Sequence, residues 1–214
     1  MRGIPRICDV QPDTASDDDR GCIIEAAYNC LSEPHSGAIP VAKILQRAGV
    51  STRAFYRHFE SKDELFLAML RQESDALARR LDHIADEAPG APVDQLKAWI
   101  EEMFGLTRDP RSLMHLVVLD SDEVRAAKGY REARERTHAH RERSLVEILR
   151  RGRRDGSFPL ADPDHDAMAI SALVSREMSV RGSADGCELR RARGRVLYFA
   201  LRALGAVAAT TDRR

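Results

Sequence analysis

The strongest constraint on the fold of this chain lies in residues 39–65, which read IPVAKILQRAGVSTRAFYRHFESKDEL. Apolar residues recur at helical spacing over 39–48, and Gly49 follows, where a glycine can adopt positive φ and end the helix. Ser51 is a good N-cap for a second helix, predicted over 52–59, because its hydroxyl can accept a hydrogen bond from the first turn. Two short helices joined by a tight glycine turn indicate a helix-turn-helix motif, whose second helix enters the major groove of DNA.

The predicted second helix has an apolar face and a free face. Phe55 and Phe59 are four residues apart and are expected to face inward, which leaves basic, hydroxyl and aromatic side chains outside. Arg53 is the best candidate for reading a base, since a guanidinium can bind guanine with two hydrogen bonds. The residues expected to contact DNA are Ser51, Thr52, Arg53, Tyr56, Arg57, His58 and Lys62. Alternatively, the two arginines only solvate a surface, Tyr56 packs beneath them, and His58 is a structural hydrogen-bonding residue.

The segment AGVSTRAFYRHFESKDEL resembles the DNA-binding domain of the TetR family of bacterial transcriptional regulators. The matching positions are Ala48, Gly49, Val50, Ser51, Tyr56, His58, Phe59, Lys62, Glu64 and Leu65. Ile39 and Pro40 depart from the family pattern, which usually has a Thr or Ser cap there, and Leu45 replaces a common alanine. The resemblance implies an all-α fold, with an N-terminal three-helix helix-turn-helix domain followed by a larger helical domain for ligand binding and dimerisation.

Charge supports DNA binding locally rather than globally. The chain has 34 Lys and Arg against 34 Asp and Glu, so its net charge is zero. Residues 39–62 carry five basic side chains against Glu60 alone, a net charge of +4. No run of 18 apolar residues and no apolar signal core occur, so we expect a cytoplasmic protein without a membrane partner. The four cysteines have neither metal-binding nor disulfide spacing, and free thiols are expected.

The rest of the chain reads as a series of helices. We expect a disordered arm over 1–18, a helix-turn-helix domain over 19–65, and an effector-binding and dimerisation domain over 66–210. Helical periodicity and breaks at Gly and Pro predict helices at 20–33, 39–48, 52–59, 61–88, 92–107, 110–119, 121–154, 163–182 and 187–209.

Two further sets of residues have expected roles in the second domain. In the family, this region encloses a small-molecule pocket, and soft or aromatic side chains suit an adaptable cavity. The expected ligand-binding residues are Trp99, Met103, Phe104, Met114 and His115, although all five could equally form ordinary core. The last helix is apolar over much of its circumference, which favours a dimer interface or a central core helix. The expected interface residues are Met178, Val196, Phe199, Ala200 and Leu204.

An enzyme is the rival interpretation. Glu135 and His138 have the spacing of paired ligands in di-iron helix bundles, but only Asp162 with His165 resembles the second pair that such a site needs. Residues 125–154 carry eleven basic against four acidic side chains, which fits a solvated face, an anionic ligand or additional DNA contact.

We therefore expect a ligand-responsive DNA-binding regulator with no catalytic residue, cofactor or metal. It would act as a repressor that binds a palindromic operator as a homodimer and is released by a small-molecule effector. The alternative is a helical-bundle enzyme or small-molecule-binding protein whose helix-turn-helix is purely structural.

Overall fold

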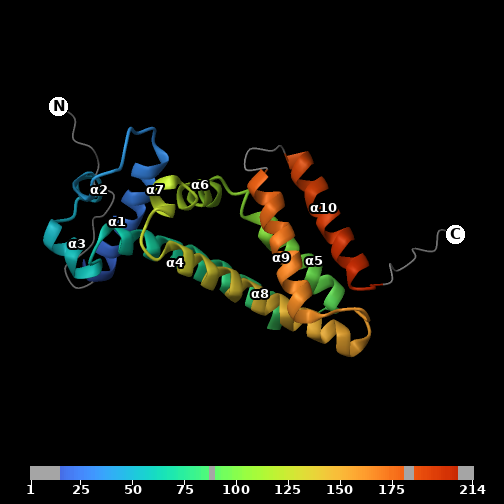
Figure 1. Cartoon of the computed structure of the whole chain (residues 1–214). Helices are drawn as coiled ribbons and strands as arrows, with labels where there is room; N and C mark the ends of the chain where they lie inside the picture. The colour runs from blue at the N-terminus through green and yellow to red at the C-terminus, as the bar shows by residue number, and fades with distance from the viewer. Residues whose placement is uncertain (1–14, 87–89, 181–185, 207–214) are drawn as a thin grey trace. The chain divides into compact units, whose positions relative to one another are not determined.

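The computed structural model describes residues 15–86, 90–180 and 186–206, and these residues form helices and connecting turns without any strand (Figure 1). The all-α fold class predicted from the sequence is confirmed. The helices are α1 (Ala15–Ser32), α2 (Val41–Ala48), α3 (Thr52–His58), α4 (Lys62–Asp86), α5 (Pro92–Gly105), α6 (Pro110–Leu119), α7 (Asp122–Arg125), α8 (Tyr130–Asp155), α9 (Pro163–Val180) and α10 (Gly186–Ala203).

Helix α1 begins at Ala15, about five residues earlier than the sequence suggests. Asp18 and Asp19 thus lie near the helix N-terminus, where acidic side chains interact favourably with the helix dipole. The expected disordered arm over 1–18 is therefore wrong for residues 15–18. Its remaining part, 1–14, lies outside the described residues.

The single helix predicted over 121–154 is also wrong, because the chain forms α7 and α8 with a turn between them. Gly129 has φ of 86°, which a continuous α-helix does not allow. The Tyr130 backbone N–H donates to the Ala127 carbonyl over 3.1 Å, and the Tyr130 hydroxyl donates to the Leu119 carbonyl over 3.1 Å. Tyr130 therefore closes the turn through its backbone N–H and ties the start of α8 to the end of α6 through its hydroxyl.

The chain divides into two compact units. Unit 1 comprises Met1–Gln72 and Met114–Ala133, and unit 2 comprises Glu73–Leu113 and Arg134–Arg214. The functional domains expected at 19–65 and 66–210 stay a prediction.

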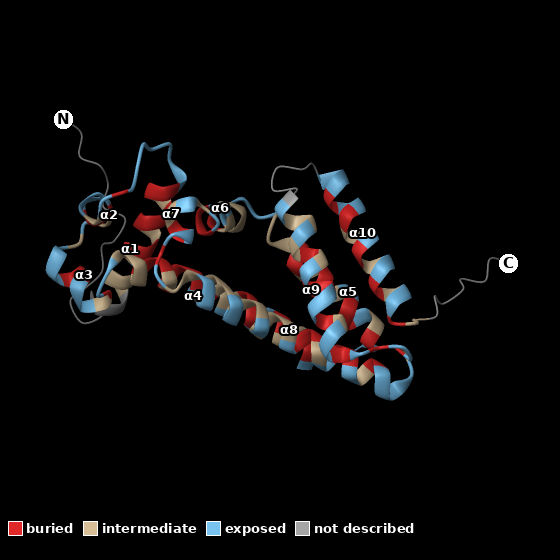
Figure 2. Ribbon diagram, viewed as in Figure 1, coloured by how far each residue is buried: buried red, intermediate tan, exposed pale blue. Residues whose placement is uncertain are grey.

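Unit 1 buries the apolar faces of α1, α2 and α3 around a common core (Figure 2). Helix α1 packs against both α2 and α3. Segments distant in sequence complete this core, because Val118, Leu119 and Val124 of α6 and α7 are also buried in it. The Tyr28 hydroxyl donates to the Met69 carbonyl over 3.3 Å, which ties α1 to α4.

Unit 2 is a helical cluster in which α10 packs against α5 and α9. Its core contains large side chains of α5, together with Leu145, Ile148 and Leu149 of α8. The Leu160 backbone N–H donates to the Leu204 carbonyl over 3.1 Å, which fastens the segment before α9 to the end of α10. This core is separate from the core of unit 1.

Candidate nucleic-acid interface

The turn between α2 and α3 has the geometry that the sequence predicts. Gly49 adopts φ of 70° and ψ of 24°, the left-handed conformation, and its backbone N–H donates to the Leu45 carbonyl. The Val50 N–H donates to the same carbonyl over 3.2 Å. Ser51 then caps α3, since its Oγ accepts from the Ala54 N–H over 3.1 Å. A side chain at position 49 would be strained in this conformation.

Helix α2 begins at Val41, two residues later than predicted. Pro40 takes the N-cap position with extended φ and ψ of −67° and 144°, and its side chain makes no cap hydrogen bond. Proline is compatible with this position because it lacks the backbone N–H that a helix start leaves unpaired. The departure from the family pattern at residues 39 and 40 therefore shortens α2 without disturbing the turn that follows it.

Helix α3 is anchored from behind by two phenylalanines. Phe55 and Phe59 are buried, with ring centroids 5.5 Å apart, as the sequence predicts. The opposite face is open, with Tyr56 61% exposed beside the exposed Thr52 and Arg53. The buried pair fixes the rotation of α3 and so decides which side chains face solvent.

The arginines on this face differ in their contacts. Arg57 Nη2 lies 3.1 Å from Asp19 Oδ2 of α1, and the Arg57 side chain remains 58% exposed. Such an exposed pair contributes about 0–1 kcal/mol, so a phosphate can replace the carboxylate at little cost. Arg53 makes no ion pair within the ranges that the structure describes, and its guanidinium is available to a partner.

His58 and Lys62 are less accessible than the sequence suggests. His58 is half-buried, and its Nε2 has no hydrogen-bond partner among the described residues. Lys62 is 23% exposed, pairs through Nζ with Glu123 Oε1, and lies over the Phe66 ring at 5.3 Å. A phosphate contact by Lys62 would therefore compete with an ion pair inside unit 1.

Glu123 is a residue that the sequence analysis missed. Its Oε1 accepts from the Ile39 backbone N–H over 2.9 Å as well as from Lys62, and its Oε2 lies 3.6 Å from His35 Nε2. His35, Lys62 and Glu123 line an open cleft of about 680 Å³, together with further residues of α4 and α7. Nothing local in the sequence marks Glu123, because Lys62 and Ile39 precede it by 61 and 84 residues.

The five expected ligand-binding residues do not form one cluster. Trp99, Met103 and Phe104 are buried in the core of unit 2, whereas Met114 and His115 belong to unit 1. The His115 ring stacks on Tyr28 with centroids 3.8 Å apart and an interplanar angle of 13°. That these five residues bind a ligand stays a prediction.

The expected dimer residues likewise divide between core and surface. Val196, Ala200 and Leu204 are buried in the core of unit 2, so their side chains leave no area for a second chain. Met178 is half-buried, and Phe199 is 54% exposed beside the exposed Tyr198. The assignment of Val196, Ala200 and Leu204 to an interface is corrected, because that face of α10 packs inside its own unit.

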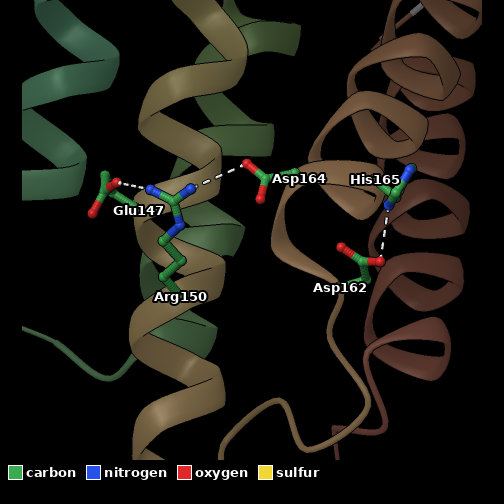
Figure 3. Close-up of polar contacts among 5 residues, drawn as sticks. All are labelled: Glu147, Arg150, Asp162, Asp164 and His165. Atoms are coloured by element: carbon green, nitrogen blue, oxygen red, sulfur yellow. Dashed lines mark hydrogen bonds and ion pairs between the residues drawn. The ribbon is translucent and has the colours of Figure 1, made fainter.

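The residues considered for a metal site have other contacts. Nδ1 of His138 accepts from Arg141 Nη2 over 2.5 Å. Nδ1 of His165 lies 2.8 Å from Asp162 Oδ2, as Figure 3 shows. This exposed pair raises the pKa of His165, chiefly through its hydrogen bond to Asp162. In the part of the chain that the structure describes, no group of three or more His, Cys, Asp or Glu side chains could hold a metal ion.

The basic helix α8 carries local ion pairs at its C-terminal end. Arg150 Nη1 lies 2.8 Å from Glu147 Oε1, and its Nη2 lies 3.1 Å from Asp164 Oδ1 of α9 (Figure 3). For Arg150, the interpretation of residues 125–154 as a solvated, charged helix face is sufficient, because both of its partners are exposed acidic side chains.

Two general expectations concern cysteines and membranes. Cys22 is disulfide-bonded, so the expectation of four free thiols is wrong for this residue, while Cys30 is a buried free thiol and Cys187 is in no disulfide. No helix of the described residues is both long enough and apolar enough to cross a membrane.

A short capped helix with a basic free face, joined by a tight turn to a helix that packs on the same core, defines a helix-turn-helix protein. Residues 23–69 match the family described as bacterial regulatory proteins, tetR family. The nucleoid occlusion factor SlmA of Vibrio cholerae serotype O1 is 30% identical over 168 residues, which are 74% of this chain and 80% of that protein. The chain belongs to the TetR family.

Two other similarities are more limited in what they show. SlmA of Vibrio vulnificus is 30% identical over 110 residues, so the match spans only 55% of that protein and 48% of this chain. The structure of SmeT, the repressor of a Stenotrophomonas maltophilia multidrug efflux pump, in complex with triclosan matches with a TM-score of 0.73. That match covers 92% of this chain and 98% of the SmeT chain at 23% identity, and it shows the shared fold.

Proposed function

We propose that this protein is a ligand-responsive transcription regulator that binds a palindromic operator as a homodimer. It acts in the cytoplasm as a repressor, and a small-molecule effector releases it from DNA. The observation that carries the proposal is the open face of α3, where Thr52, Arg53 and Tyr56 are exposed while Phe55 and Phe59 fix the helix from behind.

The side chains on this face have separate proposed roles. Arg53 reads a guanine in the major groove, because its guanidinium has no intramolecular ion pair within the described residues to give up. Thr52, Tyr56 and Arg57 contact the adjacent backbone or a thymine methyl group. Ser51, His58 and Lys62 complete the proposed set near the ends of α3, with Lys62 exchanging Glu123 for a phosphate.

The effector site is proposed in the interior of unit 2. Trp99, Met103 and Phe104 of α5 are buried there among residues of α8, α9 and α10. SmeT, which shares the fold, has been captured with triclosan, and this precedent supports a small organic ligand. Met114 and His115, which belong to unit 1, complete the proposed set of ligand-binding residues.

The dimer interface is proposed on the exposed side of α9 and α10. Met168 of α9 and Tyr198 and Phe199 of α10 expose more than half of their surface. Large exposed apolar side chains on neighbouring helices are typical of a protein–protein contact. A two-fold dimer would place two α3 helices about one DNA turn apart, ~34 Å, as a palindromic operator requires.

A DNA titration tests this function. The parent protein is titrated onto labelled DNA from the intergenic region upstream of its own gene, at two salt concentrations, with scrambled DNA of equal length as the control. We expect sequence-selective binding that weakens with salt. Absence of binding, or equal binding to the scrambled DNA, would contradict the proposal and favour a structural helix-turn-helix.

A further inference from the structure

Arg141 of α8 is a largely buried cation that has no anionic partner among the residues the structure describes. Its Nη2 contacts Nδ1 of His138 at 2.5 Å and donates to Oγ of Ser175 on α9 over 3.1 Å. Its Nε is shielded from solvent and has no hydrogen-bond acceptor among the described residues. Both of its contacts are thus to groups that carry no negative charge.

The charges around Arg141 leave it electrostatically unsatisfied. Burial, followed by the nearby charge of Arg134, lowers its pKa to about 10, so it stays protonated at neutral pH. Burial, followed by the charges of Arg141 and Arg134, lowers the pKa of His138 to about 4, so the imidazole is neutral. Glu142, the next residue, acts in the opposite direction on Arg141 but forms no ion pair with it within the described residues. A buried charge is costly unless an opposite charge and hydrogen bonds compensate it.

A second polar group on the facing helix is also unsatisfied. Ser171 is fully buried, and its Oγ has no hydrogen-bond partner within the described part of the chain. It lies one turn before Ser175 on α9, and Ser175 donates to the Ser171 carbonyl over 2.9 Å. Because Arg141 contacts Ser175, the same region of α8 and α9 holds an unpaired N–H and an unpaired hydroxyl.

Apolar groups of α5 are tied to this region. Trp99 Nε1 donates to Ser144 Oγ over 3.1 Å, and Ser144 Oγ donates to the Arg141 carbonyl over 3.0 Å. The indole thus lies against the turn of α8 that begins at Arg141. A ligand held by Arg141 would have its apolar part close to the buried side chains of α5.

We infer that Arg141 and Ser171 form an anion subsite for the carboxylate of a small organic acid with an apolar body. A guanidinium presents N–H donors in the geometry that a carboxylate accepts, and the serine hydroxyl adds another donor. The inference rests on the proposed effector function and specifies the class of effector. Carboxylate binding would compensate the charge that the protein leaves unpaired, which is the differential interaction that a ligand needs to shift a conformational equilibrium.

Matched acids and neutral analogues test the site by thermal unfolding of the full chain. The probes are decanoate against decanol and phenylacetate against phenylacetamide, with the parent, Arg141→Met, Arg141→Lys and Ser171→Ala. We expect at least one acid to raise the melting temperature of the parent, whereas its neutral analogue gives no rise. Arg141→Met should weaken acid binding by about 10-fold or more, with smaller losses in the other two variants.

Unliganded Arg141→Met provides an independent measurement. Replacing an uncompensated buried charge by an apolar side chain should leave the melting temperature unchanged or raise it. A clear fall would mean that Arg141 is a structural residue and would overturn the inference. Equal stabilisation by acid and neutral analogue, or by neither, would also overturn it. If Arg141→Met does not fold, the other two variants decide the test. Acid binding that is unchanged in both Ser171→Ala and Arg141→Lys would then overturn the inference.

The same samples separate this inference from the proposed regulatory function. Operator binding by the parent is measured with and without the acid that stabilises it. Loss of DNA on addition of acid supports both proposals. Acid binding through Arg141 without any effect on DNA supports the subsite and contradicts the effector mechanism. DNA binding with no acid binding contradicts the subsite and leaves the DNA-binding function standing.

Discussion

The backbone N–H of Ile39 donates to Oε1 of Glu123 over 2.9 Å, although the two residues are 84 positions apart. The same carboxylate pairs with Lys62, the first residue of α4. Glu123 therefore joins the segment that enters α2 and the start of α4 to α7. Any movement of α7 within unit 1 would act on both ends of the helix-turn-helix through this one side chain.

Replacing Glu123 with Ala is expected to destabilise unit 1 by about 1–3 kcal/mol, because it leaves a largely buried lysine and a backbone N–H without their acceptor. Glu123→Gln should cost less, since the amide oxygen still accepts from Ile39. Urea unfolding measures the stability of both variants. Asp122→Asn, which changes the exposed neighbouring residue, is the control. Equal stability of Glu123→Ala and the control would contradict the role assigned to Glu123.

Arg53→Ala is expected to weaken operator binding by about 1–3 kcal/mol and to relax the preference at one base pair, as loss of a bidentate guanine contact requires. Fluorescence anisotropy on the operator and on single-base variants measures both effects. Arg125→Ala removes an exposed arginine of α7 and should leave affinity and base preference unchanged. A uniform loss over all bases would instead assign Arg53 to the phosphate backbone.

Arg57→Ala should weaken binding to every DNA sequence alike and reduce the slope of log K against log salt by about one unit. Asp19→Ala gives the matched comparison, because it removes the carboxylate with which Arg57 pairs in the free protein. The Asp19→Ala variant should bind DNA with slightly higher affinity than the parent, since Arg57 then has no ion pair to break. Titrations at several salt concentrations check both variants, and an unchanged slope in Arg57→Ala would exclude a phosphate contact.

Phe199→Glu should convert the proposed dimer to monomers that remain folded, because this exposed side chain contributes little to the core of unit 2. Val117→Glu changes another apolar residue that is more than half exposed, on α6, and should not alter the oligomeric state. Sedimentation at micromolar concentration measures the mass, and circular dichroism verifies the fold. A parent protein that sediments as a monomer would refute the dimer itself.

His138 should make stability fall on acidification. Burial, followed by the charges of Arg141 and Arg134, lowers its folded-state pKa from 6.5 to about 4. Between pH 6.5 and 4 the unfolded chain therefore binds more protons at this site than the folded chain, and stability is lost as pH falls through this window. His138→Gln should flatten that part of the stability curve, measured by urea unfolding. His165→Gln should have the opposite effect, because the hydrogen bond to Asp162 raises the pKa of His165 in the folded state. A His138→Gln curve that parallels the parent would contradict the shift.

Local features of the fold were predictable where a few neighbouring residues decide the conformation. Gly49 requires positive φ, Ser51 caps the next helix, and Phe55 with Phe59 sets its buried face, all within one short segment. The start of α1 was missed because residues 15–19 read ASDDD and carry no apolar periodicity. The turn before α8 was missed because helical periodicity does not show that Gly129 interrupts the helix.

Long-range contacts were not predictable from one sequence. The partner of Lys62 lies on α7, and the side of α10 that packs against α5 and α9 is decided by helices far away in the chain. An apolar helix can bury one face in its own core and expose the other, and the sequence pattern alone does not distinguish them. The ligand-binding role of Trp99 and His115 stays a prediction, since the sequence pattern does not show that these residues belong to different units.

Trp99 is the single tryptophan of the chain. Its indole is fully buried and hydrogen-bonded to Ser144, whose own hydroxyl reaches the carbonyl of Arg141. The protein thus contains an intrinsic fluorophore next to the inferred carboxylate subsite. Emission from this one chromophore should report changes around Arg141 directly, so that an unlabelled protein can be screened against acids in solution and the response compared with that of Ser144→Ala.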